Sequence, residues 1–145
     1  MSTSTTGRTG EILNSLLRGE LSAIETYSKA IHKFPKAGAL QTLERIRTDH
    51  LHSVSILRDL IHRDGGHPST DSGAWGSFAK TVESAASLLG HNSAIAALKQ
   101  GEKHGIGEYE DALKDSDLPG DIKQTLRGLF EPLQRHLRYL ENAQD

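Results

Sequence analysis

Apolar residues recur at spacings of three, four and seven residues in four long stretches of the chain. This spacing places apolar side chains on one face of an α-helix, so each stretch predicts an amphipathic helix. The first runs from about residue 10 to Pro35, the second ends at Gly65-Gly66, and the last two flank a turn at residues 116–119. At 145 residues with 35% hydrophobic content, the chain can bury one core. We therefore predict an all-α bundle of four helices in a single domain over residues 10–143, preceded by a flexible tail over residues 1–9.

The link between the second and third helices is long. Residues 65–73 lack periodicity, and the apolar residues after them predict a short extra helix lying across the bundle. These residues are Trp75, Phe78, Val82, Ala86 and Leu89. A long crossover between two helical hairpins is the connection pattern of ferritin-like antiparallel four-helix bundles, which is the fold that we expect.

The chain also contains an internal repeat. Residues 20–27 and 102–109 both have a Glu, an Ile four positions later and a Tyr seven positions later, at an offset of 82. Apolar residues of the second helix match those of the fourth at an offset of 83. We interpret the chain as two helical hairpins related by pseudo-symmetry.

Polar side chains interrupt the apolar face of each predicted helix. Glu20 and Glu102 fall in the middle of the stripes of the first and third helices, and His50 and His136 fall on or beside those of the second and fourth. A buried carboxylate must be protonated, hydrogen-bonded, paired with a cation or bound to a metal. We predict that these four side chains converge in the core, as metal ligands or as a self-satisfied structural group.

Several neighbours have supporting roles in this prediction. Tyr27 and Tyr109 are core aromatics whose phenols can hydrogen-bond the carboxylates, and Arg47 can replace a metal by pairing with a glutamate. Asp49 is a further candidate ligand at the edge of its helix stripe. Residues that fall off the stripes, and that we expect at the surface, are His52, His104 and Glu108.

Residues 16–27 resemble the first helix of bacterioferritin-type proteins, and that resemblance implies a metal-ligand role for Glu20. Nearly the whole chain is similar to a ferritin-like family, domain of unknown function 2383. The similarity includes Gly65-Gly66, residues 72–76, Gly101-Glu102 and the turn at residues 117–119. It implies the fold and no activity.

One departure from the di-iron pattern stands out. A di-iron bundle has an acidic residue three positions before each core histidine, whereas this chain has Arg47 and Leu133 there. We therefore do not expect a full ferroxidase centre.

Composition narrows the classes of function. The chain has no cysteine, which excludes disulfides and thiolate chemistry. Its net charge of -2 is spread without a basic stripe, so we expect no nucleic-acid partner. No segment is apolar enough for a membrane span, and we expect the protein to stay in the cytoplasm.

Two functions follow as hypotheses. The first is a core site for Fe, Mn or Zn, and an enzyme built on it would be a metal-dependent oxidoreductase acting on iron, oxygen or peroxide. The second is a metal-free structural or stress-associated binding protein that keeps the fold. Use of Glu and His as acid and base in a hydrolase or transferase is a third reading, but no nucleophile elbow or phosphate loop accompanies it. We expect a homo-oligomer, with a dimer favoured, in which Trp75 serves an interface or packs on its own bundle.

Overall fold

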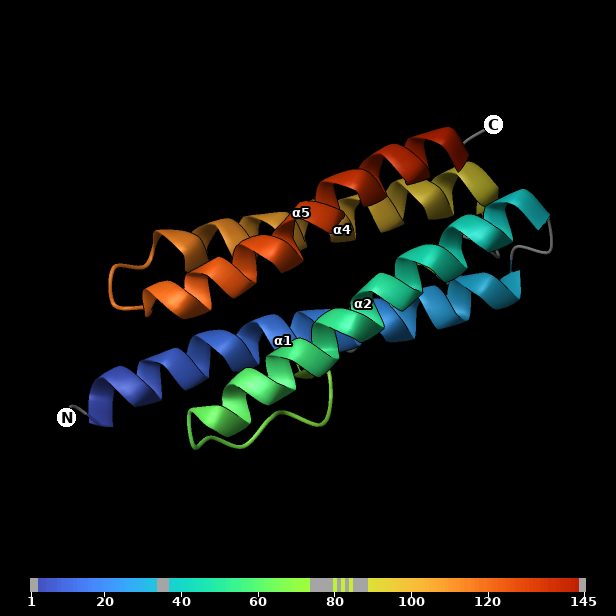
Figure 1. The fold of residues 1–145 in the computed structure, drawn as a ribbon. Coiled ribbons are helices and arrows are strands. Elements are labelled where there is room, and N and C mark those ends of the chain that lie inside the picture. Colours follow the sequence, from blue (N-terminus) through green and yellow to red (C-terminus); the bar gives the residue numbers. More distant parts are fainter. Residues whose placement is uncertain are drawn as a thin grey trace.

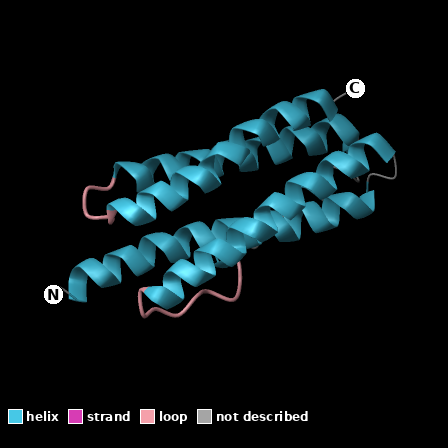
Figure 2. Cartoon of the chain, in the orientation of Figure 1, coloured by secondary structure: helices cyan, strands magenta, loops and turns pink. Residues whose placement is uncertain are grey.

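The chain folds into four long helices in the computed structural model, which describes residues 3–33, 37–73, 80, 82, 84 and 89–143. They are α1 (Thr3–Lys33), α2 (Ala37–Arg63), α4 (His91–Lys114) and α5 (Gly120–Ala143) (Figure 1). The described part of the chain contains no strand (Figure 2). The predicted all-α, four-helix fold is confirmed. None of the described helices combines the length and apolar character needed to cross a bilayer.

The helices pack as two hairpins. α1 pairs mainly with α2, α4 pairs mainly with α5, and the hairpins meet along α1–α4 and α2–α5. The chain colours show that α2 and α4 run in the same direction, opposite to α1 and α5 (Figure 1). The segment after α2 must therefore travel back along the bundle before α4 begins, as the predicted crossover requires.

The expected short helix in that crossover falls mostly on residues outside the described ones. This holds for Trp75, Phe78 and Ala86, so the prediction that Trp75 serves an interface or packs on its own bundle lies outside the described residues. Of the residues described there, Val82 is fully buried in the core and Leu89 is 74% exposed. Leu89 therefore does not contribute to an apolar face toward the bundle.

The start of the crossover is fixed to α1. The side-chain amide of Asn14 donates to the carbonyl of His67 at 3.1 Å, and its oxygen accepts from the N–H of Ser69 at 2.8 Å. Arg18 donates from Nη1 to Ser69 Oγ at 3.0 Å. Two α1 side chains therefore hold this loop, Asn14 through main-chain groups and Arg18 through the Ser69 side chain.

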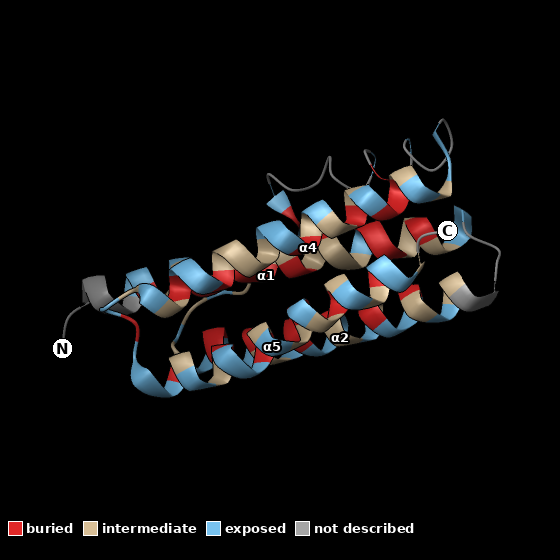
Figure 3. Cartoon of the chain, turned by 90° about the horizontal axis from the view of Figure 1, so that it is seen from above, coloured by how far each residue is buried: buried red, intermediate tan, exposed pale blue. Residues whose placement is uncertain are grey.

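The apolar core consists of two clusters separated along the bundle axis. Figure 3 shows buried positions along the facing sides of the helices. One cluster joins the N-terminal half of α1 to the C-terminal half of α2 and includes Leu13, Leu57 and Leu126. The other joins the opposite halves and includes Leu43, Ile95 and Leu140. The polar residues predicted for the core lie in sequence between these two groups on every helix.

The structure corrects the predicted start of the first helix. α1 begins at Thr3, so residues 3–9 form helical turns where we expected a flexible tail. Thr9 is buried, and Arg8 Nε donates to Asp115 Oδ2 at 3.1 Å, so contacts with the α4–α5 connection involve these turns. α4 begins at His91, and Gly90 occupies its N-cap position with a φ of 96° and no side-chain capping bond.

Candidate metal centre

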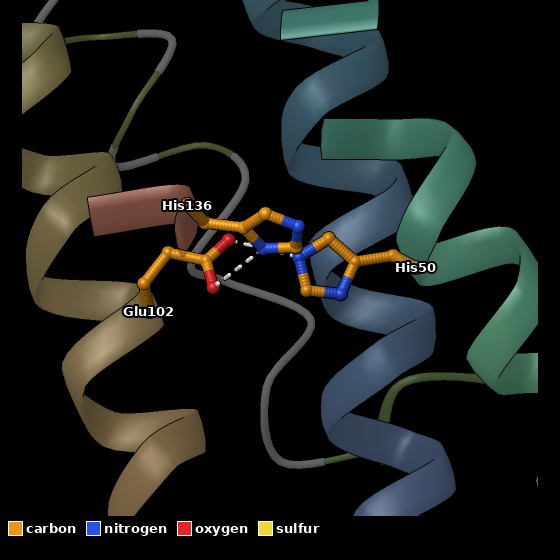
Figure 4. Close-up of side chains that lie close together, drawn as sticks. All are labelled: His50, Glu102 and His136. Carbon is orange, nitrogen blue, oxygen red and sulfur yellow. Dashed lines mark hydrogen bonds and ion pairs between the residues drawn. The ribbon is translucent and has the colours of Figure 1, made fainter. Parts of the chain in front are cut away.

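Four polar side chains meet in the middle of the bundle, one from each helix. Glu20 of α1, His50 of α2, Glu102 of α4 and His136 of α5 are all at most 4% exposed. Figure 4 shows His50, Glu102 and His136 pointing toward one another. The convergence predicted from helical spacing is therefore present, while the role of these residues as metal ligands stays a prediction.

His50 lies between two carboxylates. Its Nδ1 is hydrogen-bonded to Oε1 of Glu20, and its Nε2 lies 2.8 Å from Oε1 of Glu102. Each ring nitrogen of this buried imidazole thus has an acidic partner. Because the two glutamates belong to different hairpins, His50 joins the two halves of the bundle.

His136 also has a carboxylate at each ring nitrogen. Its Nδ1 is 3.3 Å from Oε2 of Glu102, and its Nε2 is 2.8 Å from Oδ2 of Asp49. The Asp49 side chain is 38% exposed, whereas that of His136 is 1% exposed. Asp49 therefore lies at the edge of the site, where we expected it, and contacts the outward-directed ring nitrogen of His136.

The two tyrosines bond to the glutamates crosswise. The Tyr27 hydroxyl of α1 donates to Glu102 Oε1 of α4 at 2.8 Å, and the Tyr109 hydroxyl of α4 donates to Glu20 Oε2 of α1 at 2.7 Å. Each tyrosine is seven residues from the glutamate of its own helix, but its hydroxyl donates to the glutamate of the facing helix. This exchange follows from the antiparallel packing of α1 and α4.

Burial and pairing displace the protonation equilibria of the site. Burial by itself would lower the pKa of His50, but the facing carboxylates of Glu102 and Glu20 outweigh it and raise that pKa well above its ordinary value. Burial would raise the pKa of Glu102, but His50 and His136 outweigh it and hold that pKa far below its ordinary value. Burial and the neighbouring carboxylates raise the pKa values of Tyr27 and Tyr109 well above 10.0.

Three of the four core residues form a compact ligand set. One ligand atom from each of His50, Glu102 and His136 lies within 4.8 Å of the other two. The nitrogens that face Glu102 are His50 Nε2 and His136 Nδ1, and the opposite nitrogens bond to Glu20 and Asp49. Among the residues that we predicted as ligands, Glu20 is therefore placed behind His50 and does not join the compact set.

Arg47 does not have the position that we considered for it. It donates from Nη1 to Ser28 Oγ at 3.3 Å and is half-buried. The cation that faces Glu20 and Glu102 is the His50 imidazole when it is protonated. His52 and His104 are exposed, as their helical phase predicted.

Glu108 lies beside the core site, which the sequence did not predict. We expected it at the surface, but it is half-buried and its Oε2 accepts from Ser15 Oγ at 3.2 Å. Burial raises its pKa, against the lowering effects of Ser15 and His104. The offset of 82 pairs Glu108 with Thr26, which is 1% exposed in the structure, but no pattern in the sequence indicated burial at either position.

Comparison with known proteins identifies one family. The model of a family described as Domain of unknown function (DUF2383) matches residues 8–115, a range that contains Glu20, His50 and Glu102. His136 lies beyond the matched range. No curated protein and no solved structure matches this chain.

Proposed function

Because the chain belongs to the Domain of unknown function (DUF2383) family, whose name assigns no activity, we propose a function from the site itself. The protein binds one divalent transition-metal ion in the bundle core, through His50, Glu102 and His136. The observation that carries this proposal is the hydrogen bonding of the two histidines. Each points one ring nitrogen toward Glu102 and has a carboxylate on the other nitrogen.

That arrangement is typical of histidines that ligate metals. A ligating imidazole usually donates its remaining N–H to a carboxylate, a carbonyl or water, which fixes the tautomer and orients the ring. Glu20 would serve His50 in this way, and Asp49 would serve His136. Tyr27 in turn donates to Glu102 and helps to orient the carboxylate ligand.

The donor set indicates which ions suit the site. Two imidazole nitrogens and one carboxylate oxygen favour Fe, Mn or Zn, whereas Mg and Ca prefer an all-oxygen shell. Three protein ligands also leave coordination positions for solvent or another small ligand. Bound iron would supply redox chemistry with oxygen or peroxide, and bound zinc would supply Lewis acidity.

A metal-free role is the second candidate, and one observation favours it. Within the described residues, every buried side-chain nitrogen and oxygen already has a hydrogen-bond partner. A protonated His50 between Glu20 and Glu102 would be a satisfied ion-pair network without any ion. Such a network would join the hairpins and leave the protein to act as a structural or binding module.

Metal analysis of the purified protein tests the first candidate. Protein prepared without chelator or metal-affinity resin is assayed for metal per chain, and affinity is then measured by competition with a chromophoric chelator. We expect Glu102→Gln to lose binding almost completely, because it replaces a ligand. Glu20→Gln and Asp49→Asn should weaken binding about 10- to 100-fold, because they alter only the partners of the histidines.

His52→Gln is the matched control, since this histidine is exposed on the same helix as His50. It should bind metal like the wild type. If the wild type takes up none of the three metals, or if Glu102→Gln binds as tightly as the wild type, the metal proposal is wrong. The metal-free network then stands, and the same substitutions should change only the stability.

A further inference from the structure

A cavity of about 50 Å³ lies between α1 and α4 and reaches the buried carboxylates. It extends from the half-buried positions of Gly19, Ala23 and Gly105 to the buried Glu20 and Glu102. His50 also lines it, whereas His136 does not. The cavity therefore approaches the metal-ligand set from the α1–α4 side, opposite the edge where Asp49 contacts His136.

Glycines in the middle of two helices create part of this space. Gly19 of α1 and Gly101 and Gly105 of α4 line the cavity, although an interior glycine weakens a helix relative to alanine. Their backbones do not require glycine, because the described glycines with positive φ are Gly65, Gly73 and Gly90.

Close packing does not require glycine at positions 19 and 105 either. A Cβ added at Gly19 would lie 3.4 Å from Glu108 Oε1, and one added at Gly105 would lie 3.9 Å from Leu133 Cδ1. Both distances are ordinary van der Waals contacts. What glycine contributes at these positions is open volume, at a cost in helix stability.

The charges and polarity of the lining restrict the ligand. Among the described residues, the lining includes the carboxylates of Glu20, Glu102 and Glu108 and no lysine or arginine. Three carboxylates outnumber the one imidazole of the lining, that of His50, so an anion would be repelled. Most of the remaining surface is apolar and includes Leu16, Leu98, Leu133 and the glycines. A hydrated cation would lose solvation against this surface, so an uncharged molecule fits best.

The volume restricts the ligand further. One water needs about 10–15 Å³ of such space, so a cavity of about 50 Å³ has room for roughly three to five waters. We propose that this cavity binds a small uncharged molecule of two to four non-hydrogen atoms and holds it beside Glu102 and His50. Binding of this molecule in the cavity does not depend on the metal proposal. Binding of the same molecule to a metal ion rests on the proposed function.

Xenon tests the cavity without any metal, because this uncharged probe enters small apolar cavities. Xenon-induced shifts of backbone amide signals are recorded for the wild type and for Gly105→Leu and Gly105→Ala. We expect shifts at α1 and α4 residues that line the cavity, at least ten-fold weaker xenon binding in Gly105→Leu and an intermediate loss in Gly105→Ala. Gly107→Ala is the control, since Gly107 lies on the same helix outside the lining. Absent shifts in the wild type, or undiminished shifts in Gly105→Leu, would overturn the proposal.

Nitric oxide tests the connection to the metal. Ferrous protein is exposed to this uncharged diatomic probe, and the complex is followed by electron paramagnetic resonance. Gly105→Leu should retain iron at the wild-type stoichiometry and bind nitric oxide at least ten-fold more weakly. Equal binding would show that the cavity does not lead to the ion. A wild type that holds no iron would instead contradict iron binding at the proposed metal site, and the xenon result would still decide whether the cavity binds ligands.

Discussion

Among the individual side chains, His50 has the most constrained environment. It is buried, contacts a carboxylate through each ring nitrogen and stacks 5.6 Å from the Tyr27 ring, measured between centroids. Removing one partner of a buried ion pair leaves a charge without compensation, which typically costs about 3–5 kcal/mol. The metal-free fold therefore depends on the protonation states of His50 and Glu102.

The pH dependence of the metal-free protein should reveal both groups. The pKa of Glu102 is lowered by folding, so its contribution is complete above the unfolded value near 4.5 and is lost as the pH falls toward the lowered value. The pKa of His50 is raised, so its contribution is complete below about 6.5 and is lost as the pH rises through the raised value. Urea unfolding in chelator should therefore show a maximum between these limits.

His50→Gln separates the two limbs of this profile. The variant should be less stable at neutral pH and should lose the part of the alkaline decline that His50 causes. His62→Gln, at an exposed position of the same helix, should leave the profile unchanged. An alkaline decline of full size in His50→Gln would show that another group is responsible.

The crosswise phenols make a second prediction. Tyr27→Phe removes a buried hydrogen bond to the Glu102 carboxylate, and hydrogen bonds to charged groups contribute about 1.5–3 kcal/mol. We expect the free energy of unfolding to fall by about this amount in urea titrations. Tyr139→Phe serves as the control, because Tyr139 is half-buried and lies under the Arg45 guanidinium. Equal losses in both variants would argue against a special role for the Tyr27 hydroxyl.

Helical phase predicted which of these residues are buried, because phase depends only on the spacing within one helix. Which atoms meet depends on how far each helix is shifted along its neighbour, and one sequence does not encode that shift in any local pattern. The predicted bonding of the phenols to the carboxylates is present, but the sequence could not show that Tyr27 bonds to Glu102 of the facing helix. For the same reason it could not show the place of Glu20 behind His50 or the contact of Arg47 with Ser28.

Among the helices, α1 differs most from expectation. The Ser, Thr and Gly residues near its start have weak helix propensity, so the sequence predicted no helix before about residue 10. The contacts at these turns come from a distant part of the chain, where Asp115 accepts from Arg8. Tertiary contacts of this kind override local propensity and leave no trace in a local pattern.

The cavity glycines of α4 lead to a prediction about helix stability. Gly105→Ala should raise the free energy of unfolding by about 0.5–1 kcal/mol, because alanine restricts the unfolded chain and favours the helix. The added Cβ would make an ordinary contact with Leu133. Thermal and urea unfolding check this value, with Gly107→Ala as a comparison expected to give a similar gain. A loss of stability in Gly105→Ala alone would mean that its neighbours cannot accept even one methyl group.

In the whole molecule, the two hairpins repeat the carboxylates and phenols but not the imidazoles. The offset of 82 relates Glu20 to Glu102 and Tyr27 to Tyr109. The offset of 83 relates His50 to Leu133, and Ser53 to His136. Half of the site is therefore pseudo-symmetric and half is not. The repeat was visible in the sequence. The structure adds that both imidazoles, which break the symmetry, lie beside the same carboxylate, that of Glu102.

This asymmetry predicts the stoichiometry of metal binding. A second ion, related to the first by the pseudo-symmetry, would need imidazoles at the positions of Leu133 and Ser53. Leu133 is 3% exposed and Ser53 is 6% exposed, so both are packed into the bundle, and neither offers an imidazole nitrogen. Titration with Co²⁺, followed by its visible absorption and by native mass spectrometry, should saturate at one ion per chain. Glu102→Gln should show no such saturation, since it removes the carboxylate that both histidines face. Saturation at two ions, both lost in Glu102→Gln, would mean that the carboxylates alone can complete a second site and that the histidines do not limit the number of ions.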